Sequence, residues 1–541
     1  MTDNANIARH LGAMAAARPE AAALKIPRGR TAAGGIDYLT LTFAELDAEA
    51  AAWSARLRQA GVRRGDTALL MVRPGLPLIA CSFALFRLGA VPVVIDPGMG
   101  LRHFLGCVRR TRPRALVGIA PAQFASRVFR SAFAGTACRV WVPSSLTARL
   151  PPGGTGEALA ENGAGDLAAI LFTSGSTGPP KGVRYEHGMF AAQVALLQST
   201  YRIASGEIDL PMLPIFSLFN PALGMTTIVP EIDPRRPAAV DPARIVRAVL
   251  QEQVTNSFGS PTLWRIVADH CRRRGLALPS LRRVLCAGAP VPDALWDDAR
   301  TLLPNGELHS PYGATEALPV STLAASERAS LRGKGACVGR PVAGIRVKVI
   351  ALSDSPIGFF DETSELPRGT VGEIVVEGSA VTREYDRLPE ATAAAKIHDR
   401  ETGEVWHRMG DCGYLDDAGR IWFCGRKAER VRTAAAVLYT EPCERVFRRH
   451  PRASRCALVG IGEPNRQMPA LVVESRTRSR TERRRLASEL RALGRADPDA
   501  DSVRLFYFRS RLPVDVRHNA KIHRLDLARW ASKKPPAEAP D

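Results

Sequence analysis

A glycine- and hydroxyl-rich segment, LFTSGSTGPPKGV, occupies residues 171–183 and follows the apolar run AAI. A strand that leads into such a segment places backbone N–H groups and hydroxyls around a concavity that suits phosphate oxygens. Its glycines let the main chain approach an anion closely, and Lys181 supplies a positive charge. The spacing is not that of the nucleotide P-loop, because Lys181 lies six residues after Gly175 and is followed by Gly182. GSTG alone fits a surface turn without a ligand, whereas the whole segment predicts a phosphate-binding loop.

Three later segments carry groups that can bind the rest of a nucleotide or a metal ion. They are SPYGATEALPV (310–320), HRMGDCGYLDDAGRIWFCGRK (407–427) and PVDVRHNAKIHR (513–524). In the first, Tyr312 offers a flat aromatic face, Thr315 a hydroxyl and Glu316 a carboxylate able to hold Mg²⁺. In the second, Asp411 can accept both hydroxyls of a ribose, and Arg426 follows across a predicted hairpin with the turn DDAG.

Each of these segments also has an ordinary interpretation when it is taken alone. YGATE fits the capped start of a helix, and the predicted hairpin fits a plain β-meander. Lys521, the lysine of the third segment, fits a solvated side chain in a turn before a C-terminal helix. The functional interpretation therefore depends on the order and spacing of all four segments together.

From about residue 40 the chain alternates between helical and strand patterns. TFAELDAEAAAWSARLRQAGV (42–62) has helical spacing and a glycine stop, and RGDTALLMV (64–72) has the pattern of a strand. Further strands are expected at 91–95, 114–119, 168–174, 282–288, 345–350 and 372–378. Helices that alternate with apolar strands predict an α/β fold with largely parallel sheets.

The composition of the chain changes near Gly425 and Arg426. A small α+β pattern of about a hundred residues follows, with two expected strands, a long arginine-rich helix and the strand-like SVRLFYF. The last ten residues, SKKPPAEAPD, are expected to be a disordered tail. A chain of 541 residues is also long enough for two or more domains.

The formal net charge is +20, and only nine of the 74 basic residues are lysines. A charge of this size is compatible with a surface that binds nucleic acid or an anionic membrane. Because no nucleic-acid-binding motif accompanies it, we favour an ordinary solvated surface. The ten cysteines show no metal-ligand spacing and are expected to be free thiols. The N-terminus resembles no secretory signal and no segment reads as a membrane span, so we expect a cytoplasmic enzyme without a transmembrane segment.

In this order and spacing, the four segments resemble those of the adenylate-forming superfamily of acyl-CoA synthetases, luciferases and related ligases. The resemblance covers nearly the whole chain. It implies a large N-terminal adenylation domain with mixed and parallel sheets (1–424), a small mobile α+β C-terminal lid domain (425–531) and the tail (532–541). It also implies ATP and Mg²⁺ as cofactors and an acyl-adenylate as the intermediate.

The resemblance assigns a role to each matching residue. The catalytic residues are Lys521, which bridges carboxylate, α-phosphate and ribose, Thr315 at the α-phosphate, and Glu316, the Mg²⁺ ligand. The expected ATP- and AMP-binding residues are Thr173, Ser174, Gly175, Ser176, Thr177, Gly178 and Lys181 in the phosphate loop, Gly288, Ala289 and Pro290 beside adenine, Tyr312 stacked on it, Gly313, Ala314, Thr315, the ribose ligand Asp411, Phe423, Arg426 and Lys521.

Members of the superfamily differ in the group that attacks the acyl-adenylate. Coenzyme A ligases usually carry a KxxG element after the arginine, but here Arg432 stands near the lysine position and Ala435 or Ala436 replaces the glycine. The usual histidine-bearing acyl-pocket segment is replaced by LPIFSLFNPALG (213–224). Together with PYGATEALPV and PVDVRHNAKI, these departures resemble the β-lactone synthetases of bacterial long-chain olefin and β-lactone biosynthesis.

This closer resemblance implies a β-hydroxy fatty acid, a 2-alkyl-3-hydroxyalkanoic acid, as the substrate. The β-hydroxyl would attack its own activated carbonyl, giving a β-lactone, AMP and diphosphate without coenzyme A. An olefin-pathway dehydrogenase and a β-lactone decarboxylase are the family's usual companions, and no nucleic-acid partner is expected. The alternative is a medium- or long-chain fatty acyl-CoA synthetase or a fatty acyl-AMP ligase.

The acyl pocket is expected to include Phe216, Phe219, Asn220 and Gly259. The general base for closure of the lactone is not identifiable from the sequence. His187 is one candidate, although a structural role is favoured for it. Asn220 and Ser217 can orient the β-hydroxyl by hydrogen bonding, with ordinary packing as the alternative.

Overall fold

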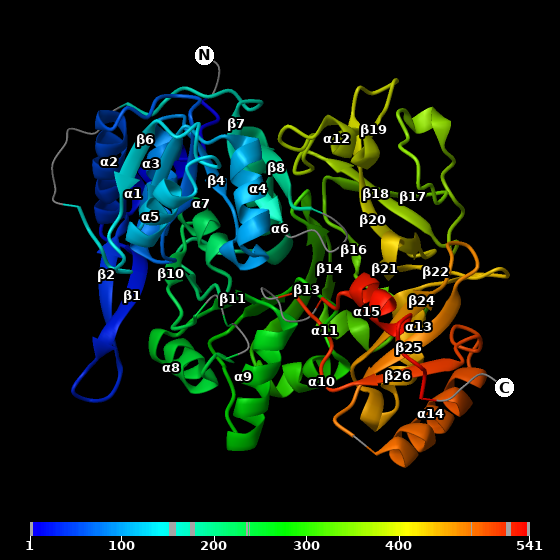
Figure 1. Ribbon diagram of the computed structural model, residues 1–541. Coiled ribbons are helices and arrows are strands. Elements are labelled where there is room, and N and C mark those ends of the chain that lie inside the picture. Colours follow the sequence, from blue (N-terminus) through cyan, green and yellow to red (C-terminus); the bar gives the residue numbers. More distant parts are fainter. Residues whose placement is uncertain are drawn as a thin grey trace.

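The computed structural model describes residues 4–150, 158–173, 179–233, 236, 239–477, 479–515 and 521–537. Three large sheets and a smaller C-terminal one make up its framework (Figure 1). Helices and strands alternate through the first half of the chain, as the sequence predicts, so the α/β fold class is confirmed. None of the helices in the described part of the chain is both long and apolar enough to cross a membrane.

The first sheet has six strands in the order β6-β5-β3-β4-β7-β8, and all neighbours are parallel except β7 and β8. Its strands are β3 (Thr67–Met71), β4 (Val91–Val94), β5 (Ala115–Gly118), β6 (Cys138–Trp141), β7 (Leu167–Thr173) and β8 (Lys181–Glu186). The helices between them are α3 (Leu76–Arg87), α4 (Leu101–Thr111) and α5 (Ala120–Val128). This sheet delivers the carboxyl end of β7 to the predicted phosphate loop.

The helix expected at 42–62 is α2 (Phe43–Gln59). Thr42 caps it through a reciprocal pair of hydrogen bonds with Glu45, at 3.2 and 2.9 Å. Its inner face buries large apolar side chains, among them Phe43 and Trp53, against the core that it shares with α3. Burial of that face, more than intrinsic helix propensity, holds α2 in place.

The second sheet has nine strands in the order β16-β14-β13-β12-β11-β9-β10-β1-β2 and is parallel at its centre and antiparallel at both ends. Its strands are β1 (Ala22–Arg30), β2 (Ile36–Thr42), β9 (Ile208–Asp209), β10 (Thr226–Ile228), β11 (Asn256–Gly259), β12 (Arg283–Cys286), β13 (Glu307–Ala314), β14 (Ala317–Ala324) and β16 (Arg340–Pro341). The associated helices are α6 (His187–Tyr201), α7 (Asn220–Leu223), α8 (Pro242–Glu252), α9 (Pro261–Arg274) and α10 (Asp293–Leu302). The carboxyl ends of β11, β12 and β13 meet at one edge of this sheet.

The third sheet is antiparallel, in the order β15-β21-β20-β18-β17, with β19 paired to β20. Its strands are β15 (Ala336–Cys337), β17 (Ile345–Ile350), β18 (Gly372–Gly378), β19 (Lys396–His398), β20 (Val405–Leu415) and β21 (Ile421–Arg426). β20 and β21 form the hairpin predicted around DDAG, and their register places Asp411 directly opposite Arg426. The turn of the hairpin thereby brings Asp411 and Arg426, from its two strands, to the same level of the sheet.

The C-terminal part forms its own small α+β unit, orange to red in Figure 1. It contains β22 (Val431–Arg432), β23 (Val437–Leu438), β24 (Cys456–Ile461), β25 (Met468–Glu474), β26 (Leu505–Arg509), α13 (Thr440–Arg448), α14 (Arg480–Arg495) and α15 (Arg524–Ala531). Its core packs α13 and α14 on one face of the three-stranded sheet. The domain boundary at 424/425 stays a prediction. Of the tail expected to be disordered, residues 532–537 are described, and the amide of Ala537 donates to the carbonyl of Phe506 at 2.8 Å.

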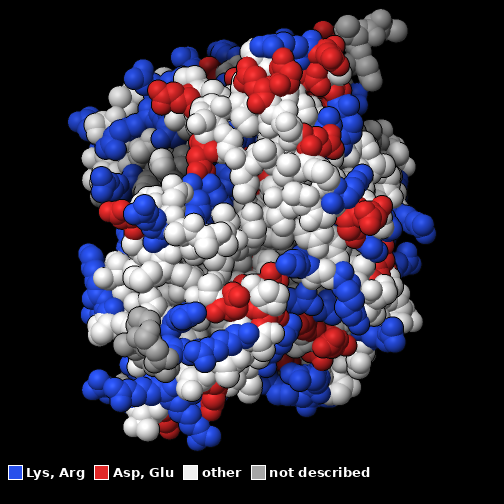
Figure 2. Space-filling model, turned by 90° about the vertical axis from the view of Figure 1, so that its right-hand side faces the viewer, with Lys and Arg blue, Asp and Glu red and all other residues white. Residues whose placement is uncertain are grey.

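Basic and acidic side chains are interspersed on the face turned to the viewer in Figure 2. Many arginines in the described chain pair with carboxylates, for example Arg346 with Glu377 at 2.7 Å and Arg430 with Asp354 at 2.8 Å. Such pairing fits the solvated surface favoured above. The ten cysteines are free thiols, as predicted.

Candidate active site

The predicted phosphate loop connects two antiparallel strands. β7 ends at Thr173, β8 begins at Lys181, and the two residues are register partners. Ser174, Gly175, Ser176, Thr177 and Gly178 lie outside the described residues, as does the side chain of Thr173. A P-loop leads from a strand into a helix, so this strand-to-strand connection agrees with the departure in spacing noted above.

Lys181 and Glu316 meet across the side chain of Tyr385. The Lys181 Nζ lies 4.7 Å from the centre of the Tyr385 ring, and the Tyr385 hydroxyl donates to Glu316 Oε1 at 2.8 Å. Burial and the neighbouring Glu316 carboxylate raise the pKa of Tyr385, so its hydroxyl remains a donor. Tyr385 therefore orients the predicted metal-binding carboxylate beside the predicted phosphate-binding lysine, a role that the sequence analysis missed.

Thr315 and Glu316 form the two-residue turn between β13 and β14. The hydroxyl of Tyr185 donates to the carbonyl of Thr315, and the amide of Thr382 donates to the carbonyl of Glu316 at 2.8 Å. YGATE is thus the end of a strand and a turn, and the interpretation as a capped helix start is wrong. Gly313 is required here, because a Cβ at this position would lie 2.5 Å from the carbonyl oxygen of Ala317.

A buried lysine stabilises this turn through Thr382. Lys396 is 2% exposed, and its Nζ donates to the carbonyl of Thr382, the residue that holds Glu316. Burial lowers the pKa of Lys396 to about 7, while the Glu316 carboxylate opposes the shift. No sequence signal marks Lys396, since it follows a run of alanines with no recognisable motif.

The predicted ribose site is assembled from β13, β20 and β21. The Tyr312 hydroxyl donates to Asp411 Oδ2 at 2.6 Å, and Arg426 Nη1 lies 3.0 Å from Asp411 Oδ1. Phe423 lies beside them, with its ring centre 6.3 Å from that of Tyr312. Burial raises the pKa of the Asp411 carboxyl, while the charge of Arg426 and, more weakly, that of Lys521 oppose the rise. The charge of Lys521 thus acts on this group from the C-terminal unit.

Replacing Tyr312 with phenylalanine should weaken ATP binding, and more so as the pH falls. The phenol stabilises the ionised carboxylate, so its loss raises the pKa of Asp411 further, and protonation removes acceptors for the ribose hydroxyls. We expect the Kd for ATP to rise about fivefold near pH 8 and more steeply toward about pH 5, equivalent to ~1 kcal/mol for one hydrogen bond. Calorimetric titration of both proteins across this range measures the effect, and parallel pH profiles would contradict it.

Lys521 begins the last described segment, just before α15. Its amide donates to Asp515 Oδ1 at 2.8 Å, and its carbonyl accepts from the Asp515 amide at 3.0 Å. Arg524 then anchors the helix start through Glu444 at 2.7 Å and Glu429 at 3.1 Å. The C-terminal helix expected after Lys521 is confirmed, whereas residues 516–520 lie outside the described residues. Arg524 is a structural anchor that the sequence analysis missed.

The segment predicted to flank adenine follows β12. Gly288 has a φ of +97°, a conformation that favours glycine, and it is succeeded by Ala289 and Pro290. The amide of Ala287 donates to the carbonyl of Gly259 at 3.1 Å, which ties this turn to the end of β11. The turn, Tyr312 and Ala314 therefore lie along the same edge of the sheet.

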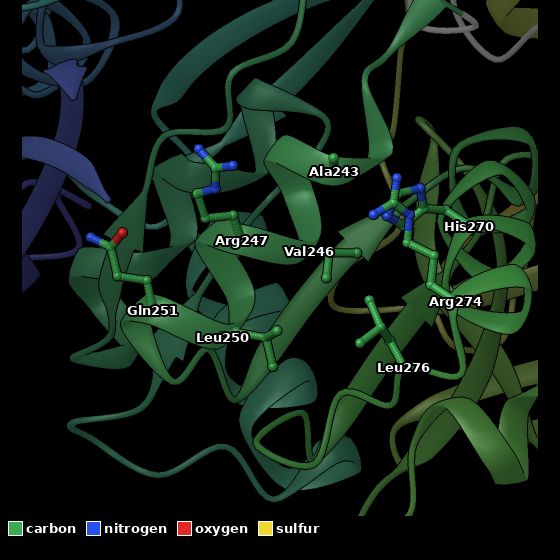
Figure 3. A pocket seen from close by; sticks show the side chains of 8 residues that line it. All are labelled: Ala243, Val246, Arg247, Leu250, Gln251, His270, Arg274 and Leu276. Atoms are coloured by element: carbon green, nitrogen blue, oxygen red, sulfur yellow. The ribbon is translucent and has the colours of Figure 1, made fainter. Parts of the chain in front are cut away.

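A narrow cavity of about 50 Å³ lies between α6, α7 and the second sheet. Phe216, Phe219 and Asn220 line it, as expected for an acyl pocket. Gly259 stands at the end of β11, where a Cβ would come within 2.5 Å of Met212 Cε. A shallower hollow between α8 and α9 (Figure 3) is lined by eight residues, none of them a predicted site residue.

The three candidate groups for the closing step have structural partners. His187 Nδ1 accepts from the amide of Ile7 at 3.2 Å, and burial lowers its pKa to about 4. The Ser217 hydroxyl donates to the carbonyl of Pro214 at 2.7 Å. The Asn220 amide donates to Asp209 at 2.9 Å. These contacts agree with the structural role favoured for His187, which stays a prediction.

Comparisons with known proteins identify the family of the chain. The family of AMP-binding enzymes matches residues 14–386. The olefin β-lactone synthetase of Xanthomonas campestris pv. campestris is 43% identical over 99% of this chain and 99% of its own length. That of Stenotrophomonas maltophilia is 43% identical over 97% and 98%, and a feruloyl-CoA synthase of an Amycolatopsis species is 30% identical over 78% and 81%.

Solved structures show the same fold at lower identity. ATP-bound MatB from Rhodopseudomonas palustris has a TM-score of 0.78 at 21% identity, covering 98% of this chain and 99% of that one. The anthranilate CoA ligase AuaEII in complex with anthranoyl-AMP has a TM-score of 0.79 at 19% identity, covering 97% of both chains. The resemblance drawn from the four segments is confirmed, and the chain belongs to the AMP-binding enzymes as an ATP-dependent, acid-activating ligase.

Proposed function

We propose that the enzyme activates a β-hydroxy fatty acid, a 2-alkyl-3-hydroxyalkanoic acid, as its acyl-adenylate and then closes it to a β-lactone. The observation that carries this proposal is the identity of 43% to two olefin β-lactone synthetases over nearly the full length of the chain. The paired Asp411 and Arg426, the supported Glu316 and the apolar cavity provide the groups that the reaction requires.

In the first step a carboxylate oxygen of the substrate attacks the α-phosphorus of ATP, and diphosphate leaves. The two reactants are both anionic, and two unit charges at about 4 Å repel by about 4 kcal/mol at an effective dielectric constant near 20. Lys521 supplies a positive charge at the attack point, and Lys181 neutralises the leaving phosphates. Asp411 and Tyr312 hold the nucleoside, so that the reacting atoms meet without a further loss of translational and rotational entropy.

In the second step the β-hydroxyl oxygen attacks the activated carbonyl carbon, the hydroxyl proton is lost, and AMP leaves. Closure of the strained ring is offset by cleavage of the acyl-phosphate anhydride. The nucleophile is already tethered to the carbonyl, so no channel for a second substrate is needed, and the apolar side chains of the cavity exclude water from the adenylate. Arg432, near the usual lysine position of the coenzyme A tunnel, is paired with Asp354 at 2.8 Å.

The residues present fit a magnesium ion. Mg²⁺ is usually held by one or two carboxylates together with substrate phosphates, and Glu316 offers a single carboxylate fixed by Tyr385. No group of three or more His, Cys, Asp or Glu side chains that would hold a metal by themselves occurs among the described residues. When bound, Mg²⁺ would neutralise the phosphates of ATP during the displacement.

The proposal extends to the surroundings of the enzyme. We place it in the cytoplasm, and an olefin-pathway dehydrogenase and a β-lactone decarboxylase would supply its substrate and consume its product. The part that carries Lys521 (425–531) would act as a mobile lid. An acyl-CoA synthetase is the second candidate, because the feruloyl-CoA synthase also matches most of the chain.

Incubation of the purified enzyme with ATP, Mg²⁺ and a 3-hydroxy fatty acid tests the proposal. We expect diphosphate and the β-lactone, in amounts that coenzyme A does not change. Mass spectrometry of the acyl products distinguishes the lactone from a thioester. A thioester formed only on addition of coenzyme A would favour the second candidate, and absence of diphosphate with every acid would overturn adenylation itself.

A further inference from the structure

The acyl cavity is apolar along most of its wall but polar at one end. Phe216, Phe219 and Phe258 are among the side chains of the apolar part. Asp209 and Asn256 also line the cavity, together with Asn220. These last three, which we call the polar base, come from β9, β11 and α7, and each is less than 5% exposed.

The polar base is a connected network. Asn256 Nδ2 donates to Asp209 Oδ1 at 3.1 Å, and Asn220 Nδ2 donates to Asp209 Oδ2 at 2.9 Å. The nearby Arg283 is engaged by Glu207, at 2.8 Å, and forms no ion pair with Asp209 that would explain the burial of this carboxyl. Burial raises the pKa of Asp209 to about 7. Two amide donors and the charge of Arg283 offset the cost of burying this carboxyl only in part, and a ligand that bonds to it would offset more of that cost.

One acceptor of the polar base has no partner among the described residues. Asn256 Oδ1 is buried and receives no hydrogen bond, although its residue is 4% exposed and lines the cavity. A buried acceptor that stays unpaired destabilises the empty cavity. A plain hydrocarbon chain would leave it unpaired in the complex as well, whereas a hydroxyl group can donate to it and interact with Asp209 at the same time.

The polar base lies far from the reacting carbonyl. Asn256 begins β11 and Gly259 ends it, and the adenine turn and Tyr312 stand at the carboxyl ends of the neighbouring strands. Three residues of a strand span about 10 Å. The β-hydroxyl that closes the lactone cannot reach this depth, so the polar base serves a different group on the acyl chain.

We propose that Asp209, Asn220 and Asn256 recognise a hydroxyl group carried by the acyl chain about 10 Å from the carboxyl carbon. This rests on the proposed function and specifies its substrate further. A neutral hydroxyl fits better than an ammonium group, because an ion pair buried in an apolar cavity carries a desolvation penalty of several kcal/mol per ion. The network discriminates against acyl chains that lack this hydroxyl, because its polar atoms stay unpaired when such a chain is bound.

The test compares 3-hydroxynonanoic acid with 3,9-dihydroxynonanoic acid, whose terminal hydroxyl reaches that depth in an extended chain. We expect the dihydroxy acid to be favoured about tenfold in kcat/KM for diphosphate release and in calorimetric affinity, equivalent to 1.4 kcal/mol. In the Asp209→Asn and Asn220→Leu variants this ratio should fall to one or below. Thr227→Val is the matched control, because Thr227 accepts from Asn220 at 2.8 Å without lining the cavity, and its ratio should stay at about ten.

Several results would overturn the proposal. One is a ratio of one in the wild-type enzyme, and another is an unchanged ratio in both polar-base variants. Stronger binding of the 9-amino analogue than of the dihydroxy acid would show that the polar base recognises a cation and not a hydroxyl group. Because affinity is measured without ATP, failure of the polar base is distinguishable from failure of adenylation, in which no acid releases diphosphate.

Discussion

Replacing Lys521 with alanine is expected to lower the rate of diphosphate release by about a hundred- to a thousandfold, the loss typical of removing one group that stabilises charge only in the transition state. The affinity for ATP should change little, because the role proposed for Lys521 is to stabilise charge that develops at the α-phosphate during attack. The charge of Lys521 opposes the rise in the pKa of the Asp411 carboxyl, which agrees with a place near the predicted nucleoside site. Single-turnover diphosphate release and calorimetric binding of ATP measure the two quantities separately.

Lys534→Ala is the matched control, since it removes the same charge from an exposed position just after α15. Its rate should equal that of the parent enzyme, and Lys521→Arg should restore only part of the lost rate, because a guanidinium does not replace a compact ammonium. An unchanged rate in Lys521→Ala would remove this residue from the mechanism. A loss of ATP affinity equal to the loss of rate would make it a binding residue instead.

The sequence predicts best those parts of the fold that local patterns determine. The strand that ends at Thr173, the hairpin that sets Asp411 opposite Arg426 and the turn before α15 are each encoded within about twenty residues. A strand pair with a short turn has only one register that buries its apolar face. The distance between two residues along the sequence therefore determines whether they lie opposite each other in the hairpin. The order of the four segments then points to one family.

Contacts between distant elements are not predictable in this way. Tyr385 and Lys396 support Glu316 from segments about 70 and 80 residues away, and nothing in their surroundings marks them as functional. The polar base has the same origin, because Asp209, Asn220 and Asn256 meet only once three elements pack around the cavity. The family resemblance of the segment 213–224 identified Asn220 as a pocket residue but not the carboxyl group that it binds.

Replacing Asp411 with alanine is expected to raise the Kd for ATP by about ten- to a hundredfold, the range for loss of a hydrogen bond to a charged group. The Asp411 carboxylate accepts a hydrogen bond from Tyr312 and forms an ion pair with Arg426. Among the described residues, no other carboxylate forms a hydrogen bond or an ion pair with either side chain. The rate at saturating ATP should fall less than the affinity, because the ribose contact is made in both the ground state and the transition state.

Asp411→Ala also leaves the half-buried Arg426 without its carboxylate, so stability has to be separated from binding. Asp411→Asn preserves the volume of the side chain while removing its charge, and Asp417→Ala changes an exposed carboxylate in the turn of the same hairpin. We expect calorimetry to show weaker ATP binding in both Asp411 variants and normal binding in Asp417→Ala, whatever their Tm values. If both Asp411 variants melted earlier but bound ATP as tightly as the parent enzyme, the carboxylate would only hold Arg426 in place. The ribose would then have to be bound by other groups.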